Sequence, residues 1–201
     1  KNKNIRLINK KLLYEYILNN LIKSKYINKI IINSDIQKKF FKKIKNSKVI
    51  YLERKKSLRG NCNMNDVILE TIKNCNDEFY IQTHATNPLL NYKTIDNAIS
   101  FYLKNKNKYD SIFSVTKIQK RLWNLNQKPI NHKINDEPTT QNLIKIFEEN
   151  SCFYIFSKKS FFKKNNRIGV KPKMFEISKF ESLDIDEEID INIAKIMTQI
   201  K

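Results

Sequence analysis

The segment Lys29-Ile30-Ile31-Ile32-Asn33-Ser34-Asp35 is a short run of β-branched residues that stops at a polar turn. A run of this length and composition, bounded by turn residues, predicts a buried strand. Outward from it, the same criteria predict strands at residues 48–52, 78–82, 110–116, 152–156 and 173–177. Apolar residues at helical spacing predict helices at residues 11–23, 36–44, 64–73, 94–103 and 189–200, with a basic helix or loop at 157–166.

Strands and helices alternate along the first half of the chain, and this order indicates the fold class. It predicts βαβ units, and so an α/β fold whose mostly parallel sheet is covered by helices on both faces. In such folds ligands bind beyond the carboxyl ends of the strands. We therefore expect a site near Ser34-Asp35 and near the turn Thr86-Asn87-Pro88, which both follow strands. Residues 117–140 are polar, contain Trp123 and are expected to leave the sheet.

The composition limits the kinds of partner. The 201 residues are 40% hydrophobic, enough for one sizeable core, and carry a formal charge of +19. Of the 39 basic residues only 5 are arginines, the residue that most often reads base edges. The lysines are spread along the chain, and lysine, isoleucine and asparagine all have AT-rich codons. The charge therefore argues against sequence-specific nucleic-acid binding, although a diffuse positive field still attracts a polyanion such as a nucleoside triphosphate.

The sequence also argues against a membrane protein and against a thiolate metal site. No apolar run approaches the roughly 18 residues that a membrane span needs, and nothing resembles a signal peptide. The three cysteines form no CxxC pair, and the chain has only two histidines. We expect a reduced, cytoplasmic protein.

The most unusual segment is Glu181–Asp190, in which six of ten residues are acidic and none is basic. In an extended Asp184-Ile185-Asp186 segment, both carboxylates lie on one face and Ile185 turns toward the core. Two carboxylates on one face repel unless a cation lies between them, and hard oxygen ligands suit Mg²⁺. We therefore predict that Asp184 and Asp186 bind magnesium and act in phosphoryl or nucleotidyl transfer.

The same acids have an alternative interpretation as the amino-terminal cap of the closing helix. Asp186 or Glu187 before residues 189–200 would favour the helix dipole. For Glu187, Glu188 and Asp190 we expect capping or solvation, and for the pair Asp184 and Asp186 we expect metal binding.

Motifs at the end of the chain resemble those of the CMP-sugar synthetases. These enzymes are the acylneuraminate (sialic acid) cytidylyltransferases and relatives that act on other nonulosonic acids. The resemblance rests on Ser182-Leu183-Asp184-Ile185-Asp186 with Asp190, preceded by Asn166-Arg167-Ile168-Gly169 and Met174-Phe175-Glu176-Ile177. No single motif is decisive, but the ordered set is fairly specific.

Earlier segments agree with this resemblance in order, over nearly the whole chain. Residues 3–13 resemble the Lys-Asn turn and helix that follow the family's nucleotide loop. Residues 30–35 resemble its second strand, which ends in a Ser-Asp turn. Gln141-Asn142-Leu143 and residues 149–154 resemble its Gln-Asp-Leu…Asn-Gly-x-x-Tyr segment.

The resemblance implies a reaction and a fold. CTP and a 2-keto sugar acid would give the CMP-sugar and pyrophosphate, with Mg²⁺ stabilising charge on phosphate oxygens. The fold would be a three-layer αβα sandwich of the nucleotide-diphospho-sugar transferase type, forming one domain over residues 1–201. An extension at about residues 117–170 would mediate homodimer contact and close the sugar site.

The resemblance also assigns residues to the nucleotide and to the metal. Asp184 and Asp186 match the family's metal-binding pair, and Lys3 and Asn4 match its nucleotide-contacting Lys-Asn. Further nucleotide-binding candidates are Arg54 or Arg59 and Asn63, for each of which a solvated loop is the alternative.

The sugar-binding positions are matched less closely. Asn150 and Tyr154 match residues of the sugar pocket, with a turn asparagine and a core tyrosine as alternatives. The family often has a Gln-Pro-Thr-Ser-Pro-Leu turn, whereas this chain has Gln82 to Leu89. Anchored on Pro88, the sugar-contacting position is His84, and Gln82 lies two residues earlier.

The beginning of the chain departs from the family pattern. The family opens with a buried strand and an Arg-x-Gly-Ser-Lys-like loop that cradles phosphate, whereas this sequence begins at Lys1 and contains only Gly60 and Gly169. Either the chain is an N-terminally shortened product or its numbering omits upstream residues. If the loop is absent, we expect weakened CTP binding.

Three functional hypotheses remain open at this stage. The first is cytidylyl transfer to a nonulosonic acid, and the second is the same reaction on 3-deoxy-manno-octulosonate. The third is an inactive fragment or a basic nucleotide- or nucleic-acid-binding protein, whose binding would weaken steeply with salt.

Overall fold

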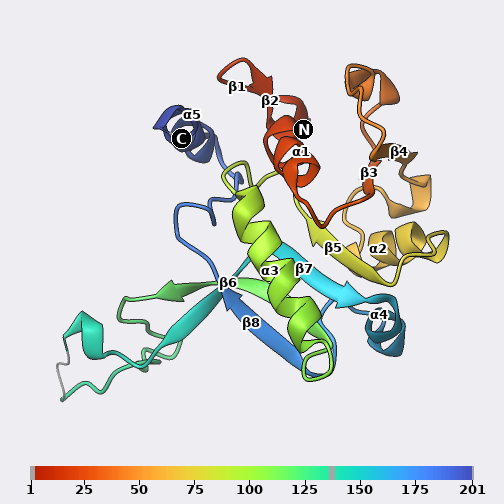
Figure 1. Ribbon diagram of the computed structural model, residues 1–201. Helices are drawn as coiled ribbons and strands as arrows, with labels where there is room; N and C mark the ends of the chain where they lie inside the picture. Colours follow the sequence, from red (N-terminus) through yellow and green to blue (C-terminus); the bar gives the residue numbers. More distant parts are fainter. Residues whose placement is uncertain (1–2, 136–138, 201) are drawn as a thin grey trace.

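The computed structural model describes residues 3–135 and 139–200, and its elements alternate as the sequence predicts (Figure 1). The α-helices are α1 (Leu13–Lys23), α2 (Met64–Lys73), α3 (Tyr92–Asn105), α4 (Lys158–Lys164) and α5 (Glu188–Ile200). The strands are β1 (Leu7–Ile8), β2 (Lys11–Leu12), β3 (Ile30–Ser34), β4 (Val49–Glu53), β5 (Phe79–Thr83), β6 (Ser111–Ile118), β7 (Ile146–Ser157) and β8 (Pro172–Glu176). Short 3-10 helices are η1 (Lys3–Ile5), η2 (Lys38–Phe41), η3 (Lys56–Leu58) and η4 (Thr140–Asn142).

The larger sheet is mixed. Its strand order is β5-β7-β6-β8, while β3 and β4 form a separate parallel pair and β1 and β2 a small hairpin. β7 is antiparallel to both of its neighbours, whereas β6 and β8 are parallel. Three strands of the larger sheet therefore share one direction and β7 opposes them. The α/β class is confirmed, with a reversed strand in a sheet that was expected to be mostly parallel.

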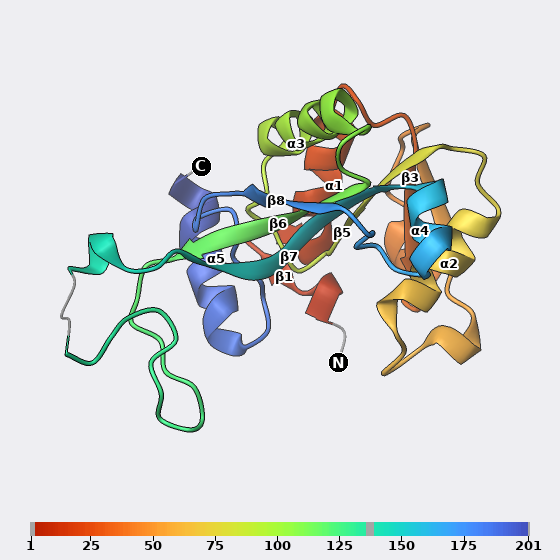
Figure 2. The ribbon, with the colours of Figure 1, turned by 90° about the horizontal axis from the view of Figure 1, so that it is seen from below.

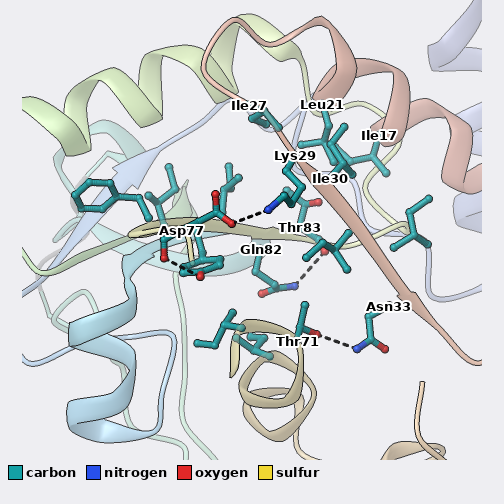
Figure 3. A pocket seen from close by; sticks show the side chains of 18 of the residues that line it. Ile17, Leu21, Ile27, Lys29, Ile30, Asn33, Thr71, Asp77, Gln82 and Thr83 are labelled. Atoms are coloured by element: carbon teal, nitrogen blue, oxygen red, sulfur yellow. Dashed lines mark hydrogen bonds and ion pairs between the residues drawn. The ribbon is translucent and has the colours of Figure 1, made fainter. Parts of the chain in front are cut away.

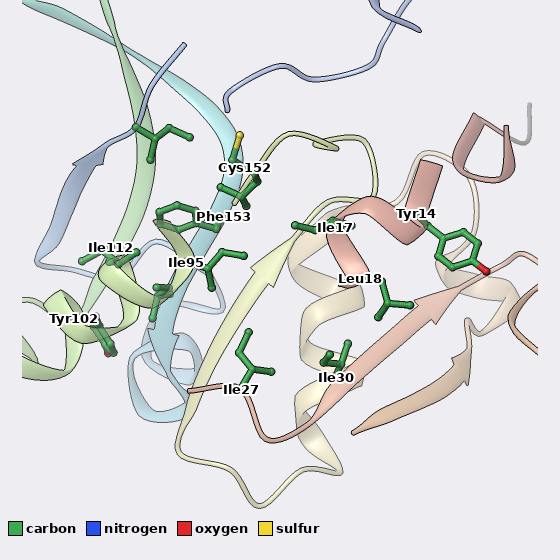
Figure 4. Close-up of a cluster of buried hydrophobic side chains, with 14 of the residues drawn as sticks. Tyr14, Ile17, Leu18, Ile27, Ile30, Ile95, Tyr102, Ile112, Cys152 and Phe153 are labelled. Atoms are coloured by element: carbon green, nitrogen blue, oxygen red, sulfur yellow. The ribbon is translucent and has the colours of Figure 1, made fainter. Parts of the chain in front are cut away.

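Side chains of β7 show why helices lie on both faces of this sheet. Phe153 and Ile155 pack into a cluster with residues of α1 and α3 (Figure 4). Tyr154 and Phe156 point to the opposite face and pack against residues of α2 and α4. All four side chains are buried, so this strand is a continuous apolar run without alternation. The result is the predicted three-layer arrangement.

The connection between β6 and β7 leaves the sheet, as expected for residues 117–140. It extends away from the body of the molecule in both views (Figures 1 and 2). Asn131 organises it, because its buried side-chain amide donates to the Lys120 carbonyl at 2.8 Å and accepts from the Leu122 amide at 2.9 Å. Whether this excursion mediates a dimer contact stays a prediction.

The helix predicted at residues 36–44 is wrong, since this segment forms only the 3-10 turn η2. Phe41 is buried between the rings of Tyr14 and Tyr51, with centroid distances of 5.0 and 5.2 Å. Apolar spacing indicated a helix, but lysines gathered on so short a segment repel each other. The packing of Phe41 therefore holds this segment in place, and no amphipathic helix face is formed.

A second, small apolar cluster joins an early segment of the chain to the acidic segment and α5. Ile8 and Leu13 pack with Ile185, Ile191 and Ala194, all of which are buried. This packing holds the acidic segment and α5 against β1 and the start of α1. It brings the carboxylates of the acidic segment close to the first described residues.

Candidate active site

Two loops that are distant in sequence meet beyond the carboxyl end of β5. The amide of Ile185 donates to the carbonyl of Thr86 at 2.9 Å, and the Asn87 side chain donates to the carbonyl of Leu183 at 3.4 Å. Ile185 is fully buried, as the extended Asp-Ile-Asp pattern predicts. The acidic segment is thereby attached to the turn that was expected to lie at a ligand site.

Asp184 carries an unpaired oxygen at this junction. Its Oδ1 is buried and has no hydrogen-bond partner among the described residues. The charge of this carboxylate acts on two neighbours. Burial lowers the pKa of His84 and Asp184 partly opposes this, whereas burial raises the pKa of Cys152 and Asp184 adds to it. A buried carboxylate oxygen without a donor is costly for a folded protein, so this position fits a cation.

Asp186 is exposed and lies beside the amino-terminal segment. Its Oδ1 is 3.1 Å from the Nζ of Lys3, and 76% of its side chain is exposed. The structure thus pairs one predicted metal ligand, Asp186, with a predicted nucleotide-binding lysine. The capping role belongs to Asp190, whose Oδ2 accepts from the amides of Asp186 and Glu187 at 2.9 and 2.7 Å.

A chain of hydrogen bonds runs along the end of β5 from Arg167 to His84. The Nη1 of Arg167 donates to the Oε1 of Gln82 at 2.8 Å, and the Nε2 of Gln82 lies 3.0 Å from the Nε2 of His84. Because Arg167 fixes the oxygen of the amide, the amide nitrogen faces the ring and donates to it. His84 therefore accepts at Nε2 and carries its proton on Nδ1.

Burial disfavours the charged form of His84. Burial lowers the pKa of His84 below its ordinary value, the guanidinium of Arg167 lowers it further, and Asp184 partly opposes both. The imidazole then offers its Nδ1–H as a hydrogen-bond donor. Gln82 and His84, both predicted for the sugar pocket, are thus brought together by the structure.

Tyr154 lies under the guanidinium of Arg167, whose carbon is 3.7 Å from the ring centroid. The phenol oxygen is 3.1 Å from the Oγ of Ser151 and donates to the Oε1 of Glu149. Burial, together with the hydrogen bond to Glu149, raises the pKa of Tyr154. Tyr154 is therefore both a buried residue of the sheet and the support of a cation at the site.

Asn150 makes its hydrogen bonds within the sheet, to residues of β6 and β7. Its Nδ2 donates to the Oγ1 of Thr116 at 2.6 Å and its Oδ1 accepts from the amide of Cys152 at 3.3 Å. The next residue, Ser151, has a φ of 57°, where the pairing of β6 with β7 changes register. The contacts of Asn150 are those of a residue that holds this bulge in β7, which agrees with the turn alternative.

A cavity of about 660 Å³ lies between β3 and β5 (Figure 3). Apolar residues of α1, α2, β3 and β5 form its middle, and the ion pair of Lys29 and Asp77 lies at one end with a separation of 3.2 Å. Asn4, Gln82 and His84 line its other end. In the described part of the chain, β3 pairs only with β4 and β5 only with β7, so both strands present unpaired edges.

The remaining nucleotide candidates are held by local contacts. Arg54 lines the cavity, and its Nε and Nη2 donate to the side chain and the carbonyl of Asn33 at 3.0 and 2.9 Å. Asn63 is the amino-terminal cap of α2, since its Oδ1 accepts from the amide of Asn65 at 2.9 Å. It does not line the cavity, whereas Asn4 and Arg54 do.

Sequence reasoning named Arg167 in a motif but gave it no role. The signal was available in composition, because arginine is scarce here and this one lies two residues before one of the two glycines of the chain. What the sequence does not show is that the loop after α4 returns to the end of β5. No group of three or more His, Cys, Asp and Glu side chains gathers within residues 3–135 and 139–200 in a way that could hold a metal.

Comparison with known proteins identifies the family of this chain. A model of the family described as cytidylyltransferase matches residues 1–200. The chain belongs to the cytidylyltransferase family. It is accordingly a nucleotidyltransferase, and CTP is a plausible substrate. A sequence comparison with curated proteins found no match.

Two solved structures resemble the fold of this cytidylyltransferase. One is 4-diphosphocytidyl-2C-methyl-D-erythritol synthase from Anaerococcus prevotii, with a TM-score of 0.70 and 14% identity, over 97% of this chain and 91% of that chain. Another is CMP:2-keto-3-deoxy-manno-octonic acid synthetase complexed with CTP, with a TM-score of 0.69 and 10% identity, over 99% of this chain and 92% of that chain. At these identities the likeness establishes only the fold. Neither structure identifies the molecule to which this chain transfers the cytidylyl group.

The environment of Cys152 leads to a prediction on thiol reactivity. Burial, with the nearby carboxylates of Asp184 and Glu181, raises the pKa of Cys152 to about 12, so its thiolate is scarce. At pH 8 we expect iodoacetamide to label the half-buried Cys62 much faster than Cys152 in the folded cytidylyltransferase. Peptide mass spectrometry measures both sites, with the urea-unfolded chain as control. Equal labelling rates in the folded protein would contradict this assignment.

Proposed function

We propose that this chain transfers the cytidylyl group of CTP to a nonulosonic acid of the sialic type. The anomeric hydroxyl of the 2-keto sugar acid attacks the α-phosphorus, which forms the new O–P bond. The bond from the α-phosphorus to the oxygen bridging the β-phosphate breaks, and pyrophosphate and the hydroxyl proton leave. The supporting observation is the hydrogen-bonded junction of the acidic segment with the turn after β5, together with the Arg167–Gln82–His84 chain at the end of that strand, in a member of the cytidylyltransferase family.

Magnesium fits the two aspartates. Asp184 has an unpaired buried oxygen and Asp186 a carboxylate on the exposed side of Ile185, and Mg²⁺ is commonly held by one or two carboxylates plus phosphate oxygens. When bound there, it would neutralise charge developing on the phosphate oxygens. Asp186 would then exchange its contact with Lys3, leaving the ammonium group to bind a phosphate.

Other residues would position the two substrates. Asn4 and Arg54 would bind CTP from the cavity end that they line. Gln82 and His84 would bind the sugar acid, with the Nδ1–H of His84 donating to one of its oxygens. Tyr154 and Asn150 would shape the sugar pocket from β7, and Asn63 would act by holding the start of α2.

The experiment is pyrophosphate release from CTP and Mg²⁺, offered sialic, legionaminic, pseudaminic and 3-deoxy-manno-octulosonic acids in turn. We expect release with one of the first three acids. Release with octulosonate alone would instead favour the second candidate, for which the likeness to the octonic acid synthetase is the specific observation. No release with any of the four acids would contradict the proposal.

We also propose that the excursion after β6 forms a homodimer contact. Several of its apolar side chains are exposed: Trp123, Leu125, Ile130, Ile134 and Ile144. Light scattering after size-exclusion chromatography is expected to give twice the mass of one chain. Leu125→Glu, at a fully exposed side chain, should shift the protein to the monomer, and a monomeric unaltered protein would contradict the contact.

The proposed place of action is the cytoplasm, where CTP is made and consumed. No described helix has the length and apolar composition needed to cross a membrane.

A further inference from the structure

We infer that Arg167 binds the carboxylate of the acceptor acid and so selects acids among the possible acceptors. This inference rests on the proposed function and names the group that recognises its substrate. Three observations support it: the guanidinium has no anionic partner among the described residues, its loop is fixed by hydrogen bonds, and the neighbouring groups can also bind an acid.

The guanidinium of Arg167 is a half-buried cation without an anion. No Asp or Glu oxygen of the described residues lies within 4.0 Å of it, although five such ion pairs occur elsewhere in that part of the chain. Of its five N–H donors, one bonds Gln82, and the rest have no acceptor among the described residues. A partly desolvated cation with free donors is the arrangement that binds a planar anion through two parallel hydrogen bonds.

The loop that carries Arg167 is tightly fixed. The carboxylate of Asp110 accepts from the amides of Val170 and Lys171 at 2.7 and 2.9 Å, and the Oγ of Ser111 accepts from the amide of Gly169 at 2.8 Å. A Cβ on Gly169 would lie 2.2 Å from the Oδ1 of Asp110, so only glycine allows this approach. The loop therefore presents Arg167 at a defined place over the ring of Tyr154.

The neighbouring groups favour a neutral-to-anionic ligand on one side of the guanidinium. Glu149 accepts a hydrogen bond from the Tyr154 hydroxyl, whereas Gln82 accepts one from the guanidinium and is itself in contact with His84. With Nδ1 protonated, His84 contributes a second donor without a second charge.

The ligand could in principle supply its negative charge as a carboxylate or as a phosphate of CTP. The planar guanidinium can bind a carboxylate through two parallel hydrogen bonds, and the neighbouring amide and imidazole can bind the sugar hydroxyls next to it. Lys3, which forms an ion pair with Asp186 at 3.1 Å, is the cation that the proposed function assigns to a phosphate of CTP. The experiment therefore separates the two sources.

Isothermal titration measures binding of the four acids and of their methyl esters, with CTP titrated separately. For unaltered protein we expect at least one acid to bind about 10- to 100-fold more tightly than its ester. In Arg167→Gln this ratio should fall to about one while CTP binding stays unchanged, and Arg167→Lys should retain part of it. Lys164→Gln is the matched control, since it removes the same charge from an exposed position in α4.

Thermal melts show that each variant is folded before it is titrated. An acid-to-ester ratio that Arg167→Gln leaves unchanged would overturn the inference. So would a loss of CTP affinity in that variant, which would assign Arg167 to the nucleotide. If CTP binds and none of the acids does, the carboxylate assignment is wrong, whereas a protein that binds no CTP would refute the proposed function itself.

Discussion

Replacing Asp184 by asparagine is expected to slow pyrophosphate release from CTP at least about a hundredfold, while the folded protein becomes no less stable. The rate falls because the carboxylate charge that would hold a cation against the phosphates is removed, and such charge stabilisation contributes several kcal/mol to a transition state. Stability is kept because the buried Oδ1 has no donor among the residues that the structure describes, so a neutral group lowers the cost of burial. Steady-state kinetics and a thermal melt measure the two effects on the same sample.

Glu187→Gln is the matched control for that substitution. Glu187 belongs to the same acidic segment, but it is exposed, and its backbone amide donates to Asp190. Its rate should stay within about twofold of the unaltered protein, because the side chain is exposed and forms no ion pair with another described residue. An Asp184→Asn protein with full activity would refute the metal-binding role of Asp184. A large loss of stability in that variant would assign this residue a structural role instead.

Phe153→Ala is expected to give the largest loss of stability among substitutions on β7. Phe153 is fully buried in the cluster between the sheet and helices α1 and α3, where it also packs edge-on against Phe175 at a centroid distance of 5.8 Å. Truncating such a ring removes its burial and leaves a cavity, at a cost of about 3–5 kcal/mol. For a domain of this size the melting temperature should fall by roughly 6–20 °C.

Phe162→Ala is the control, because that ring is 47% exposed and lies on α4. Its melting temperature should change by less than about 3 °C, since little apolar surface is lost from the core. Equal shifts for the two variants would contradict the placement of the main cluster between β7 and the helices α1 and α3. Urea unfolding of both proteins gives an independent measure of the same difference.

Several features of the fold and site follow from local sequence. Apolar runs and helical spacing predicted strands β3 to β8 and helices α1, α2, α3 and α5, since burial of a face depends on the order of residues along the chain. The two-residue strands β1 and β2 were missed. The Asp184-Ile185-Asp186 pattern predicted that Ile185 is buried, because side chains alternate in an extended segment. The turn after β5 and the acidic segment were both expected near the ligand, and they are hydrogen-bonded to each other. Their metal and substrate roles stay predictions.

Other features were decided only by tertiary structure. The direction of β7 could not be read from its residues, because an apolar run is the same in either sense and the excursion before it sets the pairing with β6. Apolar residues at 36–44 have helical spacing, yet the segment forms only a 3-10 turn because Phe41 packs between two aromatic rings from other elements.

The role inferred for Arg167 depends on contacts with residues far away in the chain. Gln82 lies 85 positions earlier in the sequence, and the loop that places the guanidinium is fixed by Asp110. The sequence by itself determined which segments are buried, since that depends on neighbours in the chain. The tertiary structure alone decided which charges lie unpaired beside one another, because electrostatic and hydrogen-bond energies depend on distances that only the folded chain defines.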